Sequence, residues 1–226
     1  MTNGGFPDIF PGLPSIRGQR LVDVGCGEGV QLRLFAGEGA HAVGLDCSAE
    51  MIELARAGEQ VADETYVEGY AEDVPFEDGE FDVVVFYNSL HHVQVDKQAT
   101  ALAEAARVAR SGGLVYLSEP LTRGPHYELI KPVDDESYVR GRAYEAIMKS
   151  AQADLEQEDE LTYDRIAQYP DYEAFRDRLI RILPDTRAVF AEMDADLRAT
   201  FERLGNKRAD GYEFVQPNRV NLLRRR

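Results

Sequence analysis

The stretch that most constrains the fold is LVDVGCGEGV at residues 21–30, an apolar run that ends in three glycines at alternate positions. Glycines permit the tight turn that joins a buried strand to a helix. Such a strand–turn–helix unit places backbone N–H groups and the positive end of a helix dipole at the carboxyl edge of a parallel sheet. The sequence therefore predicts a ligand-binding edge directly after this strand.

The first half of the chain alternates β-prone runs with segments of helical spacing. Strands are predicted at 20–24, 41–45, 65–68, 81–86 and 114–118, because each run is β-branched, aromatic or leucine-rich and is bounded by Gly or Asp. Ser48 is the predicted N-cap of the helix that follows the second strand. The run VVVF at 83–86 has no polar alternation, which indicates a strand covered on both faces by helices. The pattern predicts an α/β protein with a doubly wound, mostly parallel sheet.

Beyond Pro120 the sequence favours helices. Three apolar stripes at helical spacing predict three core-facing helices, the first capped by Asp134. The stripes are Val139, Ala143, Ile147 and Ala151; Tyr172, Phe175, Leu179 and Ile182; and Phe190, Met193, Leu197, Phe201 and Leu204. The acidic run EQEDE at 156–160 predicts a solvated connection, because it has no regular ligand spacing and no companion His. The closing residues predict a hairpin or a strand broken at Pro217 and Asn218, then a frayed basic tail at 224–226.

Charge and composition narrow the class of protein. With 25 Lys and Arg against 41 Asp and Glu, the formal net charge is -16, and a field of that sign repels nucleic acid and anionic membranes. Two cysteines make neither a disulfide framework nor a zinc set, and we predict no metal site. No stretch approaches the roughly 18 apolar residues of a membrane span, and none is typical of a secretion signal. We expect a soluble, cytoplasmic protein that binds neither nucleic acid nor membranes.

The glycine turn differs from the usual dinucleotide-binding pattern. Aligning Gly25 and Gly27 with the first two glycines of G-x-G-x-x-G puts Val30 where the third should stand. The chain has D-x-G-x-G-x-G instead, with Asp23 inside the end of the strand. A carboxylate there opposes a pyrophosphate but suits a ligand that carries an ammonium group.

The segment LVDVGCGEG resembles the first motif of the class I S-adenosylmethionine-dependent methyltransferases, particularly the small-molecule enzymes with a type 11-like methyltransferase domain. Four further segments resemble the later motifs in order: GLDCSAEMIELAR, AEDVPFEDGEFD, FDVVVFYNSLHHV and RVARSGGLVYLSEP. Together they cover about residues 20–120. The resemblance implies a Rossmann-like sheet with helices on both faces, a helical C-terminal insertion or cap, and S-adenosylmethionine as the cofactor, with S-adenosylhomocysteine as its product.

The resemblance also implies which residues bind the cofactor. Asp46 ends the second strand 17 residues after Gly29, a spacing that suits an acid taking both ribose hydroxyls. Asp73 matches the family position that accepts the adenine amino hydrogen. Cys26 is interpreted as a tightly packed small residue and not as a nucleophile. The full predicted set is Asp23, Gly25, Cys26, Gly27, Gly29, Asp46, Cys47, Met51, Ala71, Glu72, Asp73, Val74 and Asn88.

Two histidines after the fourth strand are the candidate catalytic residues. His92, and after it His91, follow the strand at the edge where the methyl group should point, and His is the side chain best suited to proton transfer near neutral pH. A structural role for either is the alternative, and neighbours on a helix diverge by about 100°, so at most one faces the pocket. Methyl transfer is an in-line displacement, which needs a base only when the acceptor must lose a proton. The segment YNSL lacks the Asn-Pro-Pro-Tyr signature used to methylate nucleic-acid bases.

A small-molecule acceptor is expected to bind mainly through the second half of the chain. Cations and phenols gather between 123 and 144, which favours an acceptor with a carboxylate or phosphate; surface ion pairing is the alternative. The candidate acceptor-binding residues are Tyr127, Tyr144 and Arg219.

The predicted division of the chain has four parts. They are an N-terminal lid segment at 1–19 with Phe6 and Phe10, the cofactor-binding core at 20–120, a mainly helical substrate-side region at 121–209, and late strands completing the sheet with the basic tail at 210–226. Two other functions stay open: a catalytically inactive S-adenosylmethionine-binding regulatory subunit, and a nicotinamide- or flavin-dependent oxidoreductase. The sequence makes no prediction of the oligomeric state.

Overall fold

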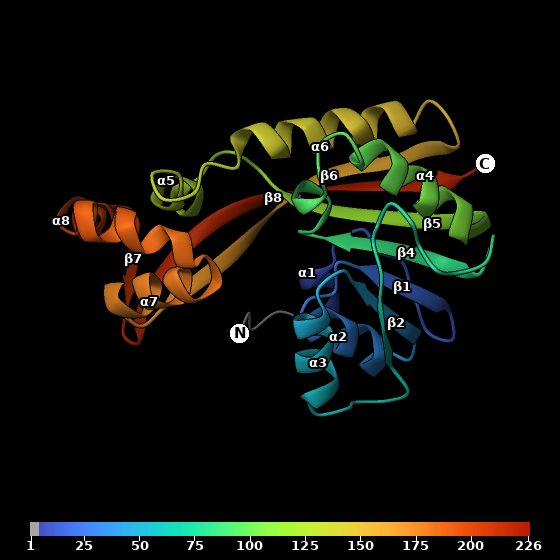
Figure 1. Ribbon diagram of the computed structural model, residues 1–226, viewed down its shortest axis with the longest axis horizontal. Helices are drawn as coiled ribbons and strands as arrows, with labels where there is room; N and C mark the ends of the chain where they lie inside the picture. Colours follow the sequence, from blue (N-terminus) through green and yellow to red (C-terminus); the bar gives the residue numbers. More distant parts are fainter. Residues whose placement is uncertain (1–4) are drawn as a thin grey trace. The chain divides into compact units, whose positions relative to one another are not determined.

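The computed structural model describes residues 5–226 of the chain (Figure 1). Its strands form one sheet in the order β3-β2-β1-β4-β5-β8-β6, with β7 paired to β8. The strands are β1 Arg20–Val24, β2 His41–Asp46, β3 Thr65–Glu68, β4 Phe81–Tyr87, β5 Ala109–Pro120, β6 Leu155–Tyr169, β7 Asn206–Arg208 and β8 Gly211–Arg225. The helices are α1 Phe6–Ile9, α2 Val30–Gly37, α3 Ala49–Ala57, α4 Gln98–Val108, α5 Pro125–Ile130, α6 Ser137–Ser150, α7 Tyr172–Ile182 and α8 Arg187–Leu204, with 3-10 turns η1 Leu90–His92 and η2 Pro184–Thr186.

The first five strands pair in parallel. In register, Leu21 of β1 lies opposite Ala42 of β2 and Val83 of β4, and the pairs β2–β3 and β4–β5 are parallel as well. Helices cover both faces, with α4 and α6 on one side and α1, α2 and α3 on the other (Figure 1). The five predicted strands and the doubly wound, mostly parallel sheet are confirmed, and β5 extends beyond the predicted 114–118.

The core beneath α4 and α6 holds together the strands whose carboxyl ends form the predicted ligand-binding edge. Phe86 of β4 and Val115 of β5 pack with Leu102 of α4 and Ile147 of α6, and all four are at most 1% exposed. Burying side chains of this size contributes roughly 1.5–3 kcal/mol each. Because β1, β4 and β5 run in the same direction, the loops that follow them meet at one edge.

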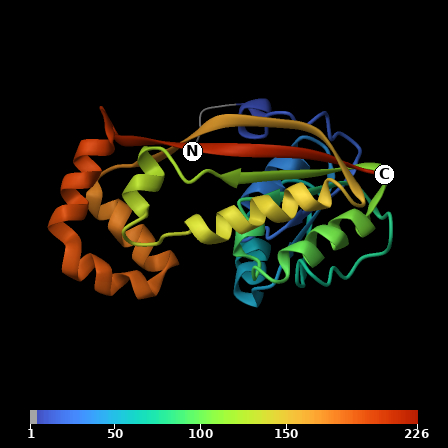
Figure 2. The ribbon, with the colours of Figure 1, turned by 90° about the horizontal axis from the view of Figure 1, so that it is seen from above.

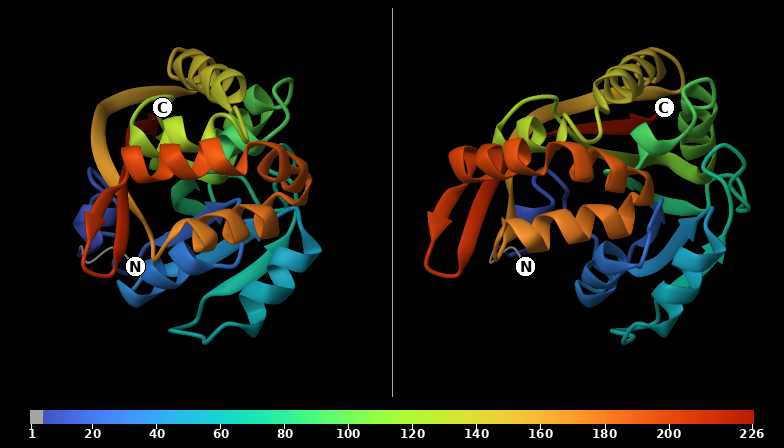
Figure 3. Two further views of the ribbon diagram at one scale, coloured as in Figure 1. Left: turned by 90° about the vertical axis from the view of Figure 1, so that its left-hand side faces the viewer. Right: turned by 60° about the vertical axis from the view of Figure 1, so that its left-hand side comes forward.

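The described residues divide into two compact units. One comprises 5–119, 139–162 and 219–226, and the other comprises 120–138 and 163–218. The second unit has its own core, in which Phe175, Phe201 and Phe214 contact one another. Within it α7 and α8 pack together and α5 packs on α8 (Figure 3). Residues 139–162, expected with the helical region, therefore group with the core strands.

The acidic run 156–160 lies in β6, so the prediction of a solvated connection is wrong. β6 ends the strand order beside β8 (Figure 2), and an edge strand tolerates charged side chains. β8 supplies partners for these acids. Arg224 Nη2 donates to Glu158 Oε2 at 2.8 Å, and Asn221 Nδ2 donates to Glu160 Oε2 at 2.7 Å.

β8 is continuous from Gly211 to Arg225, so it contains neither the predicted hairpin nor the predicted break. Proline has no N–H to donate, but the Pro217 carbonyl accepts from the backbone N–H of Leu121 and from Gln216 Nε2, both at 2.8 Å. These bonds hold the proline inside the sheet.

The basic tail is anchored, which corrects the prediction of a frayed end. Arg224 Nη1 donates to the Gly112 carbonyl at 2.5 Å, and Arg225 Nη1 donates to the Arg107 carbonyl at 2.9 Å. Each arginine thereby satisfies backbone acceptors at or near β5, and Arg224 also pairs with β6.

Two helix starts were predicted by their caps. The Ser48 hydroxyl accepts from the Met51 N–H at 3.3 Å at the start of α3, as predicted. The predicted Asp134 cap of α6 is wrong. The helix begins at Ser137, whose N–H donates to Asp135 Oδ1 at 3.0 Å.

The N-terminal segment packs on the sheet side of α2. Phe10 is fully buried and contacts Phe35 of α2 and Tyr87 of β4, with ring centroids 4.5 and 5.3 Å away. Phe6 contacts Phe10 in a tilted arrangement, with ring centroids 4.9 Å apart. Residues 1–4 of the predicted lid lie outside the described residues, and movement of the segment as a lid stays a prediction.

Candidate active site

The turn after β1 is held against the end of β2. The Gly25 N–H donates to the Leu45 carbonyl at 2.7 Å. Gly25 has φ +79°, and a Cβ there would lie 2.5 Å from Ser89 Cβ, so close packing requires glycine. Gly27 has φ +52°, and a Cβ there would meet no atom within 4 Å. A ligand can therefore lie directly against the backbone at Gly27, while Gly29 begins α2 as its N-cap.

Asp46 ties this turn to the second strand. Its Oδ2 accepts from the Gly27 N–H at 2.8 Å, and its Oδ1 accepts from the Ser48 N–H at 2.9 Å. The carboxylate is half-buried, and each oxygen keeps a second acceptor position. Asp46 thus joins the glycine turn to the end of β2, and its carboxylate retains acceptor positions for further donors.

Asp23 is a buried acid for which residues 5–226 supply no partner. It is 1% exposed, and neither carboxylate oxygen has a hydrogen bond or ion pair within residues 5–226; Oδ1 is fully buried. Burial, helped by the nearby Asp46 charge, raises the pKa of Asp23 from 3.8 to about 7. Burying an uncompensated carboxylate is costly. A cationic group at this end of β1 would offset that cost, so the residues fit a ligand with an ammonium group.

The other predicted residues of this segment have different surroundings. Cys26 is 5% exposed, and a Cβ at Gly44 would lie 2.7 Å from its sulfur, so the thiol fills a tight space under β2. Burial raises the pKa of the Cys26 thiol, which disfavours the nucleophilic thiolate. Cys47 is exposed at the end of β2, and Met51 is half-buried in the first turn of α3.

The segment 71–74 is fixed by α4. The Val74 N–H donates to Glu104 Oε2 at 3.0 Å, and Arg107 Nη2 donates to the Val74 carbonyl at 2.9 Å. Glu72 pairs with Lys97 at 2.7 Å, which lowers the pKa of Glu72. Ala71 is half-buried, whereas the Asp73 side chain is exposed.

Sequence analysis missed Glu104 and Arg107 as supports of this segment. Their spacing, three residues apart on one helix, also fits an ordinary surface pair. Only the fold shows that both side chains reach the backbone of the preceding loop.

The turn after β4 is strained. Asn88 has φ +53°, and within residues 5–226 it is the one non-glycine residue with a positive φ. Its N–H donates to the Ser118 carbonyl at 2.7 Å, and the Ser89 hydroxyl donates to the Val24 carbonyl at 2.6 Å. Strain of this kind costs about 1–3 kcal/mol and is concentrated at functional sites. The turn thus connects the ends of β1, β4 and β5.

The two histidines of η1 are in different environments. His91 is 4% exposed, and its Nδ1 hydrogen-bonds with Glu119 Oε2, while the Leu90 N–H donates to Glu119 Oε1 at 3.0 Å. His92 is exposed, and its ring centroid lies 4.1 Å from that of His91. Glu119 thus fixes the orientation of the buried His91 ring. Sequence analysis missed Glu119, although the segment SEP at the end of β5 was within the fifth motif.

Two of the three predicted acceptor residues come together. The Arg219 guanidinium lies 3.3 Å from the ring centroid of Tyr144, whose hydroxyl donates to Glu160 at 3.2 Å. Tyr127 belongs to the other unit, where it is 5% exposed and donates to Asp135 at 3.2 Å.

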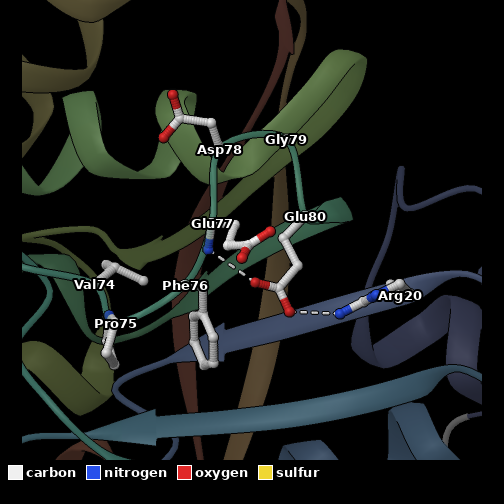
Figure 4. A pocket seen from close by; sticks show the side chains of 8 residues that line it. All are labelled: Arg20, Val74, Pro75, Phe76, Glu77, Asp78, Gly79 and Glu80. Atoms are coloured by element: carbon white, nitrogen blue, oxygen red, sulfur yellow. Dashed lines mark hydrogen bonds and ion pairs between the residues drawn. The ribbon is translucent and has the colours of Figure 1, made fainter.

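A separate cavity of about 700 Å³ lies near the amino end of β1 (Figure 4). Arg20 Nη2 pairs with Glu80 Oε1 at 2.5 Å, and Glu80 Oε2 accepts from the Glu77 N–H at 2.9 Å. Because Arg20 begins β1 and the glycine turn follows its last residue, this cavity is at the wrong end of the strand for the predicted ligand.

Comparisons with known proteins find similarity to methyltransferases. Residues 22–117 match the family described as "Methyltransferase domain". An uncharacterized methyltransferase of Synechocystis sp. is 39% identical over 100 residues, which are 44% of this chain and 46% of that protein. The demethylmenaquinone methyltransferase of Clavibacter sepedonicus is 32% identical over 157 residues, or 63% of this chain and 62% of that protein. The chain therefore covers less than two thirds of either relative.

A solved structure has a similar fold over most of the chain. A putative methyltransferase from Bacillus halodurans aligns with a TM-score of 0.63 over 94% of both chains, at 22% identity. Among residues 5–226, no helix combines the length and apolar character needed to cross a membrane. The glycine turn, Asp23 and Asp46 all lie within residues 22–117, the segment that matches the methyltransferase domain.

Proposed function

We propose that the chain binds S-adenosylmethionine at the glycine turn and transfers its methyl group to a small-molecule acceptor. The observation that carries this proposal is the buried, unpartnered Asp23 beside a turn whose Gly27 faces open space. Bound there, the cofactor supplies an electrophilic methyl group on a sulfonium. The relatives named above are methyltransferases by name, which supports the reaction class but not a particular acceptor.

Five of the predicted cofactor residues are assigned roles in the proposed site. Asp23 would accept from the ammonium group, and Asp46 would use its remaining acceptor positions for the ribose hydroxyls. Met51 and Cys47 would flank the nucleoside. The exposed Asp73 would take the adenine amino group, on a segment that Glu104 and Arg107 fix from α4.

His91 is the better candidate for a base than His92. Its Nδ1 is held by Glu119, which fixes the orientation of the ring. An acceptor that must lose a proton would then give it to this imidazole. The acidic net charge of -16 disfavours nucleic acid as the acceptor and leaves small molecules.

Replacing Gly27 by Val tests the cofactor site. We expect S-adenosylhomocysteine affinity to fall at least roughly tenfold, because the side chain enters the space above the turn, and stability to fall by about 1–2 kcal/mol from the left-handed backbone. Gly18→Val is the matched control, since Gly18 has φ +73° and equally open surroundings outside the site. It should lose similar stability and keep its affinity, measured by calorimetry and denaturant unfolding. Wild-type affinity in Gly27→Val would contradict the proposed site.

Calorimetry with S-adenosylmethionine, S-adenosylhomocysteine and NAD, followed by a screen of metabolite pools for release of S-adenosylhomocysteine, tests the function itself. Binding of the first two with release from at least one pool is expected. Tight NAD binding would favour an oxidoreductase. Cofactor binding without turnover on any pool would favour the inactive regulatory subunit.

A further inference from the structure

Arg219 of β8 is a half-buried cation without a hydrogen-bonded partner. Within residues 5–226 its guanidinium makes no hydrogen bond and no ion pair, and its Nε is fully buried. Its guanidinium carbon lies 3.3 Å from the centroid of the Tyr144 ring. Burial lowers the pKa of Arg219, because desolvation disfavours the charged guanidinium. Arginine in such a position normally meets an anion.

The acids near Arg219 are engaged by other donors. Glu160 accepts from the Tyr144 hydroxyl at 3.2 Å and from Asn221 Nδ2 at 2.7 Å. Glu119 accepts from the Leu90 N–H and hydrogen-bonds with His91. Both carboxylates act on Arg219 only through their charge. Within residues 5–226 no acceptor pairs with the guanidinium, so the N–H donors on Nη1 and Nη2 are left for a ligand.

Arg219 is connected to the proposed cofactor turn through neighbouring strands. Ser89 covers Gly25 and bonds to β1, and His91 follows two residues later in η1. His91 bonds to Glu119 at the end of β5, and β8, which carries Arg219, is the next strand in the sheet. All these residues belong to one compact unit. Arg219 is therefore close to Glu119, the residue that hydrogen-bonds with His91.

We propose that Arg219, stacked on Tyr144, binds a carboxylate group of the methyl acceptor. This inference rests on the proposed function of the same site and specifies its substrate class. A carboxylate matches two guanidinium nitrogens in a planar, bidentate pair. A monoanion is favoured over the dianion of a phosphate ester, because the cost of desolvating an anion grows faster with its charge than its attraction to one guanidinium, which Glu119 and Glu160 already weaken. Tyr144 holds the guanidinium plane by a cation–π contact.

The test measures binding of benzoate to the full chain saturated with S-adenosylhomocysteine, with neutral benzamide and with phenyl phosphate as comparisons. We expect benzoate to bind at millimolar concentration and the other two to bind more weakly. Arg219→Met should weaken benzoate binding roughly ten- to a hundredfold, because it removes charged hydrogen bonds. Arg219→Lys should retain part of the affinity. Arg17→Met, an exposed arginine of the same unit, is the control and should bind benzoate normally.

Glu160→Gln is expected to strengthen benzoate binding, whereas Arg219→Met weakens it. It keeps an acceptor for Tyr144 and Asn221 but removes a charge, so benzoate affinity should rise roughly threefold to tenfold. Tyr144→Phe keeps the ring and should keep benzoate binding. A variant that merely disturbs packing would not strengthen binding.

Four results would overturn the inference: no benzoate binding to the wild type, equal binding of benzamide, tighter binding of phenyl phosphate, or unchanged benzoate affinity in Arg219→Met. S-adenosylhomocysteine affinity is measured on every variant. A wild type that does not bind S-adenosylhomocysteine would count against the proposed function. Normal S-adenosylhomocysteine binding with any of the four results would count against the carboxylate site alone.

Discussion

Asp23→Asn is expected to make the free protein more stable at about pH 8 and to weaken S-adenosylhomocysteine binding more than roughly a hundredfold. The free protein buries an uncompensated carboxylate, whose pKa is raised from 3.8 to about 7. That rise corresponds to up to about 4 kcal/mol at a pH above 7. Asparagine removes the buried charge, and with it the attraction for the ligand ammonium group.

The pH dependence has a defined sign. Since its folded pKa lies above its ordinary value, the Asp23 carboxyl binds a proton more tightly in the folded state. Its stabilising contribution is complete below about pH 4 and is lost as the pH rises through 7. The free energies of unfolding of the free wild type and of Asp23→Asn, measured with denaturant, should therefore diverge between these two pH values. Parallel stability curves with unchanged affinity would contradict the role of Asp23.

His91→Ala is expected to lower kcat by roughly 10²- to 10⁴-fold for an acceptor that must lose a proton. Cofactor affinity should stay near wild type, because the histidine lies beyond the glycine turn. His41→Ala, an exposed histidine at the start of β2, is the matched control and should leave kcat unchanged.

Glu119→Gln separates positioning from chemistry. Its amide oxygen can still accept from the Leu90 N–H, but it no longer offers a carboxylate to His91. We expect a smaller fall in kcat, roughly tenfold, with a changed pH profile. If both variants turn over acceptor normally while His92→Ala does not, the roles of the two histidines are the reverse of our proposal.

The sequence predicts the parts of this protein that depend on local pattern. The glycine turn, the strands from β1 to β5 and the Ser48 cap follow from residues adjacent in the chain. Asp46 was predicted as a cofactor-binding residue from its spacing to the glycine turn. Its bond to Gly27 joins that turn to the end of β2.

The missed features depend on partners distant in sequence. The run 156–160 has the composition of a loop, but β8 supplies Arg224 and Asn221 from more than sixty residues away. Glu119 likewise gains its role only when β4 and β5 pair and bring His91 beside it. A single sequence carries no signal for these contacts, because neither partner has an unusual local pattern.

The most direct measurement of the central claim is the number of protons released when S-adenosylhomocysteine binds, determined by calorimetry in buffers of different ionisation enthalpy. With the pKa of Asp23 at about 7, binding should release close to one proton at about pH 6, and the release should disappear by about pH 8.5. Asp23→Asn should release none. Binding without proton release throughout this range, or the same release in Asp23→Asn, would contradict the proposal that this buried carboxylate receives the cationic end of the cofactor.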